Sequence, residues 1–270
     1  MSFLEITRGD SPLLLAFAHS GTVLPADIAP QLNPRGLALA DTDWHIHRLY
    51  AGLLENVTTI RTRIHRYVID VNRDPTGQSL YPGQNTTGLC PLTDFEGAPL
   101  YRASHRPDPQ ETERRRAAFH APYHAAIEAE MARLTARHGF AILYDCHSIR
   151  SHIPFLFEGV LPDLNIGTNR GTTCAPGLES AVHKLCAASR YSCVLNGRFK
   201  GGWTTRHYGR PAQGWHALQM ELAQSTYLET EAAPFAYDAA RAEALRSPLR
   251  KILLALQGWR PDGAAHAAFG

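Results

Sequence analysis

The sequence predicts an α/β fold in which a mixed, mostly parallel sheet is flanked by helices. Two short apolar runs, residues 12–18 and 140–144, predict buried strands that lead into polar loops. Between them, residues 110–138 carry apolar side chains at three- and four-residue steps and end at Gly139, which is typical of an amphipathic helix. Because strands alternate with helices over all 270 residues, we expect one domain spanning 1–270.

The remaining elements follow from local patterns. Residues 41–54 have near-helical apolar spacing, and residues 58–71 are rich in Thr, Ile and Val, which is typical of strands. The Pro-, Gly- and Asn-rich stretch 72–99 predicts a long loop, and such loops usually cover a site. Further elements are expected towards the C-terminus: a helix at 177–188, strands at 191–195 and 217–222, and helices at 239–245 and 247–256. We expect Pro122 to kink the helix or to mark a break between two helices, and we expect a helix break at Ser247 and Pro248.

Composition limits the classes of partner. The chain has 44% hydrophobic and 19% charged residues, which excludes a disordered protein. A net charge of +2 is too small to favour nucleic acid or an anionic membrane, and no run approaches the roughly 20 apolar residues of a membrane span. The first ten residues lack a signal-peptide pattern, and five cysteines without a CxxC pair favour reduced thiols. We therefore expect a cytoplasmic protein that acts on a small molecule.

Candidate metal ligands follow the apolar strands. His19 and His147 each come directly after a predicted strand, where ligands bind in α/β sheets. Asp41 and Asp43 could supply a carboxylate, although either could instead cap a helix. His45 and His47 are competing ligands, each His could be structural, and Asp145 could orient a liganding imidazole from behind.

These residue types suit a catalytic divalent cation. Catalytic zinc sites use three His or carboxylate ligands plus water, and the same set accepts Co²⁺, Mn²⁺ or Fe²⁺. Amide hydrolysis benefits from such a cation, because it polarises the carbonyl and lowers the pKa of water towards about 7. The sequence therefore predicts one divalent metal ion, with Zn²⁺ the first choice.

Two further features indicate substrate binding and proton transfer. Arg73 follows a predicted strand beside Asn72, with Arg66 upstream, and an arginine fork binds carboxylates bidentately. Most arginines are simply solvated, so this signal alone is weak. Glu221 lies in the apolar run 217–222, where burial would raise its pKa and suit a general base; alternatively it faces water. Cys146 adjoins His147, but neighbours on a strand point to opposite faces, which excludes a Cys-His nucleophile pair.

Seven stretches together resemble the N-formylglutamate amidohydrolase family. In chain order they are AHSGTVLP (18–25), DTDWHIHRLY (41–50), RYVIDVNRDP (66–75), SLYPGQNTTGLCP (79–91), LYDCHSIRS (143–151), FKGGWTTRHYGRP (199–211) and GWHALQMELAQSTYL (214–228). The resemblance implies hydrolysis of N-formyl-L-glutamate to formate and glutamate in histidine degradation. It also implies a fold like that of zinc carboxypeptidases and aspartoacylases.

The resemblance also implies roles for residues. His19, Asp43 and His147 match the metal ligands, and Glu221 matches the general base. The pair Asn72 and Arg73 resembles the pair that binds the substrate carboxylate in zinc carboxypeptidases. Independently of the resemblance, we expect Arg66 or Arg150 to help Arg73 hold the substrate's carboxylates, and Arg206 or His207 to donate to the oxyanion. Ala18 and His47 depart from the family, which commonly has proline and an acidic residue there, and the second change hints at adjusted substrate or metal chemistry.

Two other functions remain open from sequence. The chain could hydrolyse another N-acyl or N-formimino amino acid, which a substrate panel would reveal. It could also be a non-catalytic carboxylate-binding protein, although a pure binder does not need Glu221.

Overall fold

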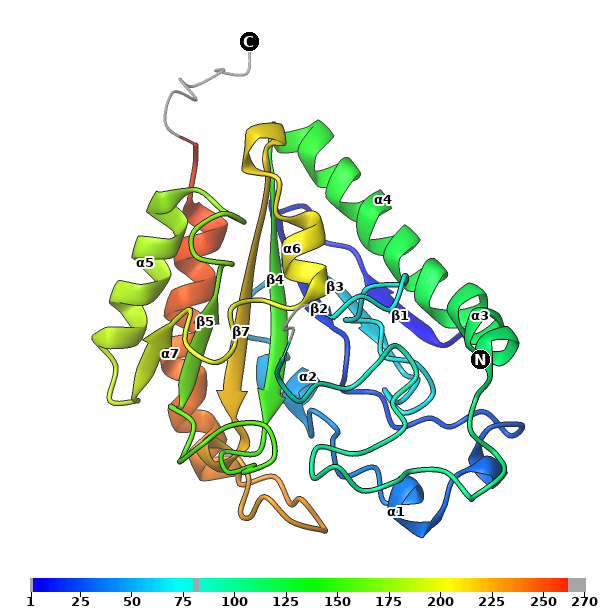
Figure 1. The fold of residues 1–270 in the computed structure, drawn as a ribbon. Coiled ribbons are helices and arrows are strands. Elements are labelled where there is room, and N and C mark those ends of the chain that lie inside the picture. Colours follow the sequence, from blue (N-terminus) through cyan, green and yellow to red (C-terminus); the bar gives the residue numbers. More distant parts are fainter. Residues whose placement is uncertain (1, 80–82, 262–270) are drawn as a thin grey trace.

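A seven-stranded mixed sheet forms the centre of the computed structural model, which describes residues 2–79 and 83–261. The strand order is β1-β3-β2-β4-β7-β5-β6 (Figure 1). The strands are β1 (Leu4–Thr7), β2 (Leu13–Phe17), β3 (Thr58–Thr62), β4 (Ala141–Ile149), β5 (Leu164–Gly167), β6 (Cys193–Leu195) and β7 (Trp215–Ala223). Pairing is antiparallel between β1 and β3 and between β5 and β7, and parallel elsewhere. The predicted mixed, mostly parallel sheet flanked by helices is confirmed.

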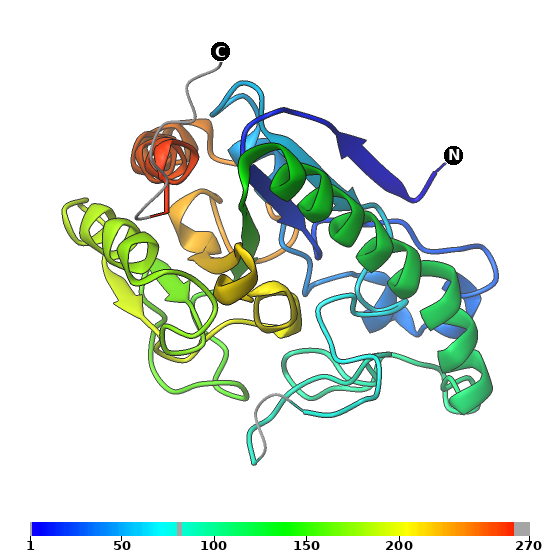
Figure 2. The same cartoon turned by 90° about the horizontal axis from the view of Figure 1, so that it is seen from above.

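Helices cover both faces of the sheet (Figure 2). They are α1 (Pro34–Leu37), α2 (Ile46–Tyr50), α3 (Pro109–Arg115), α4 (Ala121–His138), α5 (Pro176–Ala187), α6 (Trp203–Tyr208) and α7 (Ala239–Gly258). The long α4 packs on one face, and α5 and α7 pack together on the other. No helix within the described ranges combines the length and apolar character that crossing a membrane requires.

The central strand β4 separates two hydrophobic cores. Its residues alternate between the faces, so Ile142, Tyr144 and Cys146 join the core under α5 and α7, whereas Leu143 joins the core under α4. Near the carboxyl end, Asp145 and His147 replace apolar residues on the α4 face. The parallel register pairs Asp145 with Gln219 and His147 with Glu221 on β7. Four buried polar side chains thus share one face at the end where ligands bind in such sheets.

Most predicted elements exist, but several boundaries differ. The strand predicted at 58–71 stops at residue 62, and the one predicted at 140–144 continues to residue 149. The helix predicted at 110–138 is continuous, with a π-helical turn at Arg116–His120 directly before Pro122. The expected break at Pro248 is wrong, because α7 runs through it. An interior proline costs a helix about 3 kcal/mol or more, but each buried Leu or Ile contributes about 1.5–3 kcal/mol, and α7 buries five such side chains, Leu245, Leu249, Ile252, Leu253 and Leu256.

Candidate active site

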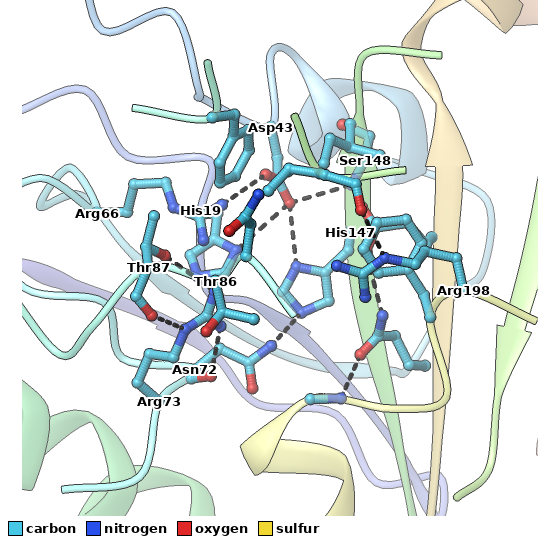
Figure 3. A pocket seen from close by; sticks show the side chains of 18 residues that line it. His19, Asp43, Arg66, Asn72, Arg73, Thr86, Thr87, His147, Ser148 and Arg198 are labelled. Atoms are coloured by element: carbon cyan, nitrogen blue, oxygen red, sulfur yellow. Dashed lines mark hydrogen bonds and ion pairs between the residues drawn. The ribbon is translucent and has the colours of Figure 1, made fainter. Parts of the chain in front are cut away.

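Three predicted metal ligands converge at the carboxyl end of the sheet. His19 follows β2, Asp43 precedes α2 and His147 lies within β4. Their ligand atoms all lie within 4.8 Å of one another, and each residue is at most 3% exposed. The Asp43 Oδ2 atom is 3.1 Å from His147 Nδ1 and 3.9 Å from His19 Nδ1 (Figure 3). Among residues 2–79 and 83–261 no second group of His, Cys, Asp and Glu is arranged in this way.

Carboxylates behind the two imidazoles make this trio suitable for a cation. His19 Nε2 is 2.6 Å from Asp70 Oδ1, and His147 Nε2 is 3.0 Å from Asp145 Oδ1. A carboxylate at Nε2 favours a hydrogen there, which leaves the Nδ1 lone pair for a metal. The donor set therefore fits a divalent cation such as Zn²⁺.

The charges around the trio also favour a cation. Burial opposes ionisation of Asp70, but the Arg66 and Arg73 guanidiniums hold its pKa well below the usual range. Burial lowers the pKa of His19. Burial also acts to lower the pKa of His147, yet Asp145 and Asp43 raise it well above 6.5. The carboxylates thus stabilise positive charge at the place that a metal ion would occupy.

The other candidate ligands point elsewhere. Asp41 Oδ2 accepts a 2.8 Å hydrogen bond from the Phe95 backbone N–H, so Asp43 and not Asp41 faces the two imidazoles. His45 Nε2 is 3.0 Å from the Phe235 carbonyl. His47 borders a separate cavity of about 370 Å³ on the α7 side of the sheet.

Glu221 is buried beside the trio. It is 7% exposed and sits opposite His147 in the strand register. The Gln219 amide donates to Glu221 Oε2 at 3.1 Å and accepts from the Gly202 N–H at 2.7 Å. Burial raises the pKa of Glu221 to about 8 against the opposing charge of His147, and Asp43 adds a smaller contribution in the same direction as burial. A carboxyl with such a pKa can both accept and return a proton near neutral pH.

Cationic side chains line the pocket above the trio. Arg66 donates to Asp70 Oδ2 at 2.6 Å, and its Nη1 is 4.0 Å from Asp43 Oδ1. Arg73 is fixed by the Thr87 carbonyl and hydroxyl at 2.9 and 3.0 Å. Asn72 Oδ1 accepts from the Thr204 N–H at 2.9 Å. Asn72, Arg66 and Arg73 therefore present amide and guanidinium groups to one cavity.

Three predicted substrate contacts are not brought to this pocket. Arg150 Nη1 donates to Glu96 Oε1 at 2.8 Å and Nη2 lies 3.4 Å from Asp41. Arg206 donates to the Gly201 carbonyl at 3.0 Å. The His207 ring stacks on Trp203 with centroids 4.2 Å apart. The substrate roles predicted for Arg150, Arg206 and His207 therefore find no support in the lining of the cavity.

Gln219 and Arg198 are among the pocket-lining residues that sequence reasoning missed. Gln219 lies two positions before Glu221, so strand alternation places both on one face, and this signal could have found it. Arg198 lies in a loop after β6, where no periodicity indicates direction. Of the stretch 79–91 that resembles the family, residues 80–82 lie outside the described residues.

Comparisons with known proteins identify the family of this chain. A family model described as N-formylglutamate amidohydrolase matches residues 11–228. N-formylglutamate deformylase of Pseudomonas aeruginosa is 49% identical over 258 residues, which is 95% of this chain and 96% of that protein. The protein of the same name from Pseudomonas putida is 44% identical over the same shares. The crystal structure of N-formylglutamate amidohydrolase from Ralstonia eutropha JMP134 has the same fold, with a TM-score of 0.79 and 23% identity over 95% of this chain and 98% of the other. The chain belongs to the N-formylglutamate amidohydrolase family.

Proposed function

We propose that this chain hydrolyses N-formyl-L-glutamate to formate and L-glutamate, with Glu221 as the proton carrier beside a divalent cation, Zn²⁺ foremost, held by His19, Asp43 and His147. The observation that supports this most is the pairing of Glu221 with His147 across adjacent strands. When bound, the cation supplies a Lewis acid that polarises the formyl carbonyl and makes water more acidic.

Glu221 moves the proton in this scheme. As a carboxylate it accepts a proton from the attacking water, and as an acid it delivers that proton to the departing amine nitrogen. Burial raises the pKa of Glu221 to about 8 without a cation, and a cation beside it would lower this pKa towards neutral pH. The amide of Gln219 holds Oε2, which leaves Oε1 to exchange the proton.

The remaining pocket residues bind and orient the substrate. Arg66 is buried beside Asp43 and Asp70, where it can donate to the negative charge that develops on the carbonyl oxygen. Asn72 and Arg73 bind a substrate carboxylate, which fixes the formyl carbon relative to Glu221. Asn85, Thr86 and Thr87 of the long loop 72–99 and Gly202 before α6 border the cavity and reduce the contact of the reacting atoms with bulk water.

The setting of the reaction is a further part of the proposal. We propose that the protein lies in the cytoplasm and that its reaction is a step of histidine degradation. We treat residues 1–270 as one domain. Five free cysteines are consistent with a reducing compartment.

Formate release tests the proposed function. The purified protein should release formate from N-formyl-L-glutamate, lose this activity after dialysis against a chelator, and regain it with Zn²⁺. N-acetyl- and N-formimino-L-glutamate serve as comparison substrates. Faster turnover of either comparison substrate would reassign the acyl group, and undiminished formate release by metal-free protein would remove the cation from the scheme.

A further inference from the structure

Arg198 also lines the active-site pocket, and the scheme above gives it no role. Figure 3 shows Arg198 and Arg73 on opposite sides of the pocket, with His147 between them in the view. Arg198 Nε donates to the Leu156 carbonyl at 3.0 Å, and its guanidinium carbon lies 5.4 Å from the centroid of the Phe199 ring. Leu156 and Phe199 also line the pocket.

The loop that carries Arg198 is firmly anchored to the end of β5. The Asn196 N–H donates to the Ile166 carbonyl at 2.7 Å, and its side-chain oxygen accepts from the Thr168 N–H at 2.9 Å. On the far side of Arg198, the Lys200 carbonyl accepts from the Asn169 N–H at 2.6 Å. A loop held before and after Arg198 presents a guanidinium whose position is set before substrate binds, which lowers the entropy cost of binding.

Neighbouring segments extend this wall. The Phe157 and Phe199 rings meet edge to face with centroids 6.1 Å apart, and the Asn85 amide donates to the Phe155 carbonyl at 2.9 Å. Residues from these segments, including Asn85, line the same pocket as Arg198. We call residues 85–87, 155–157 and 198–199 the outer wall.

We propose that Arg198 determines specificity by binding the side-chain carboxylate of N-formylglutamate, while Asn72 and Arg73 bind its α-carboxylate. This inference rests on the proposed function and assigns a partner to each end of the substrate. The α-carboxylate is attached to the carbon that bears the formamide nitrogen, whereas the side-chain carboxylate lies two methylenes further away. The nearer carboxylate therefore belongs to the arginine beside the trio.

The contacts of the arginines support that assignment. Arg73 Nη1 is 3.6 Å from Asp70 Oδ2, and Asp70 bonds His19, so Arg73 borders the trio. Arg66 is held by Asp70 and Asp43 within the inner site. Arg198 instead contacts Leu156 and Phe199, on the side of the pocket opposite Arg73. An arginine fork also distinguishes a carboxylate from an amide, because an amide lacks the charge and one acceptor oxygen.

Three substrates separate the two roles: N-formyl-L-glutamate, N-formyl-L-glutamine and N-formyl-L-isoglutamine, in which the α-carboxylate is the amide. Arg198→Gln should lower kcat/KM for N-formylglutamate by about 100-fold, mainly through KM, and should change that for N-formylglutamine little. Arg73→Gln should lower kcat/KM for both of these substrates. Arg170→Gln, at an exposed arginine of the neighbouring loop, is the matched control and should leave the preference for glutamate over glutamine intact.

The outcomes distinguish a failure of the role proposed for Arg198 from a failure of the proposed function. If Arg198→Gln keeps the wild-type preference for glutamate over glutamine, or if the wild type has none, the role of Arg198 is overturned. If the wild type releases no formate from N-formylglutamate, the proposed function fails instead. Arg198→Lys keeps the charge without the fork and should retain an intermediate preference, so it carries the test if the Gln variant does not fold. Unchanged metal content and Tm show that the scaffold is intact.

Discussion

The two faces of β4 and β7 are equally buried but chemically opposite. Cys146 and Met220 point towards α5 and α7 and join the hydrophobic core there, whereas the adjacent residues His147 and Glu221 point to the other face and meet charged side chains. Burial raises the pKa of the Cys146 thiol well above its ordinary value and leaves it neutral and unreactive. His147 is buried to the same extent, yet Asp145 and Asp43 favour its charged form. Burial alone favours the neutral form of a side chain. Burial beside groups of opposite charge can favour the charged form, which is typical of functional sites.

The helices above each face explain where the polar pocket lies. The apolar face of β4 and β7 is covered by α5 and the twenty-residue α7. Over the polar face lies the six-residue α6, whose Thr205 hydroxyl is 3.2 Å from Asp145 Oδ2 and whose preceding Gly202 N–H holds Gln219. A short helix contributes hydrogen bonds to the buried polar residues and still leaves space for a substrate.

The contrast between the polar and apolar faces is tested most directly by substitutions at neighbouring positions of β7. Glu221→Gln should reduce formate release by about 10³-fold, because an amide cannot carry the proton, while metal content stays unchanged. Met220→Leu, one residue away on the apolar face, conserves volume and should retain turnover within a few-fold, with a loss of unfolding free energy below about 1.5 kcal/mol. Steady-state kinetics and metal analysis of both variants test this, and near-normal turnover by Glu221→Gln would remove Glu221 from the mechanism.

A second pair of variants separates a partner of the trio from a buried structural carboxylate. Asp43→Asn should weaken metal binding by at least about 100-fold, because the trio loses its negative charge. Asp41→Asn should leave metal binding unchanged and lower the unfolding free energy by about 1–3 kcal/mol, because Arg150 loses its carboxylate. Competition with a chelating dye measures the first effect and urea unfolding the second. Equal metal affinity in both variants would contradict the assignment of Asp43.

The smallest effect concerns the histidine on the apolar side. Burial, with smaller contributions from Arg61 and His45 against that of Glu5, lowers the pKa of His47 from 6.5 to about 4. The unfolded chain therefore binds this proton first, so the contribution of His47 to stability is present above pH 6.5 and is lost as the pH falls towards 4. Because His47 is partly exposed, we expect about 1 kcal/mol after solvent screening. Urea unfolding of the metal-free protein between pH 4 and 7 gives the unfolding free energy at each pH. Its dependence on pH should be weaker in His47→Gln than in the wild type, and the same dependence in both proteins would refute this.

Residues that end strands were readable from sequence. His19 follows the apolar run 12–18 and His147 lies three residues after the run 140–144. Parallel strands end on one edge of a sheet, so the convergence of these two residues could be expected. The resemblance favoured Asp43 over Asp41, which sequence spacing alone left open, and the hydrogen bond of Asp41 to Phe95 now explains the difference. Elements β1, β5 and α6 were not predicted, because each has six residues or fewer and they lack a clear apolar period.

The orientation of residues that loops hold in place could not be predicted from the sequence. Arg150 follows His147 closely in sequence, but its direction is set by Glu96 and Asp41, which lie far away along the chain. Arg198 borders the pocket because hydrogen bonds of Asn196 and Lys200 with residues 166–169 fix the backbone on both sides of it. Such contacts depend on tertiary structure, and neither composition nor periodicity encodes them locally.

The register between β4 and β7 has a consequence for how this family can diversify. His147 and Glu221 are fixed by backbone hydrogen bonds between adjacent strands, which stand about 4.8 Å apart whatever the loops do. The outer wall, in contrast, is made of loop residues whose insertions and replacements do not alter that spacing. New acyl amino acids could therefore be accommodated by exchanging the wall, while the reacting groups are inherited intact.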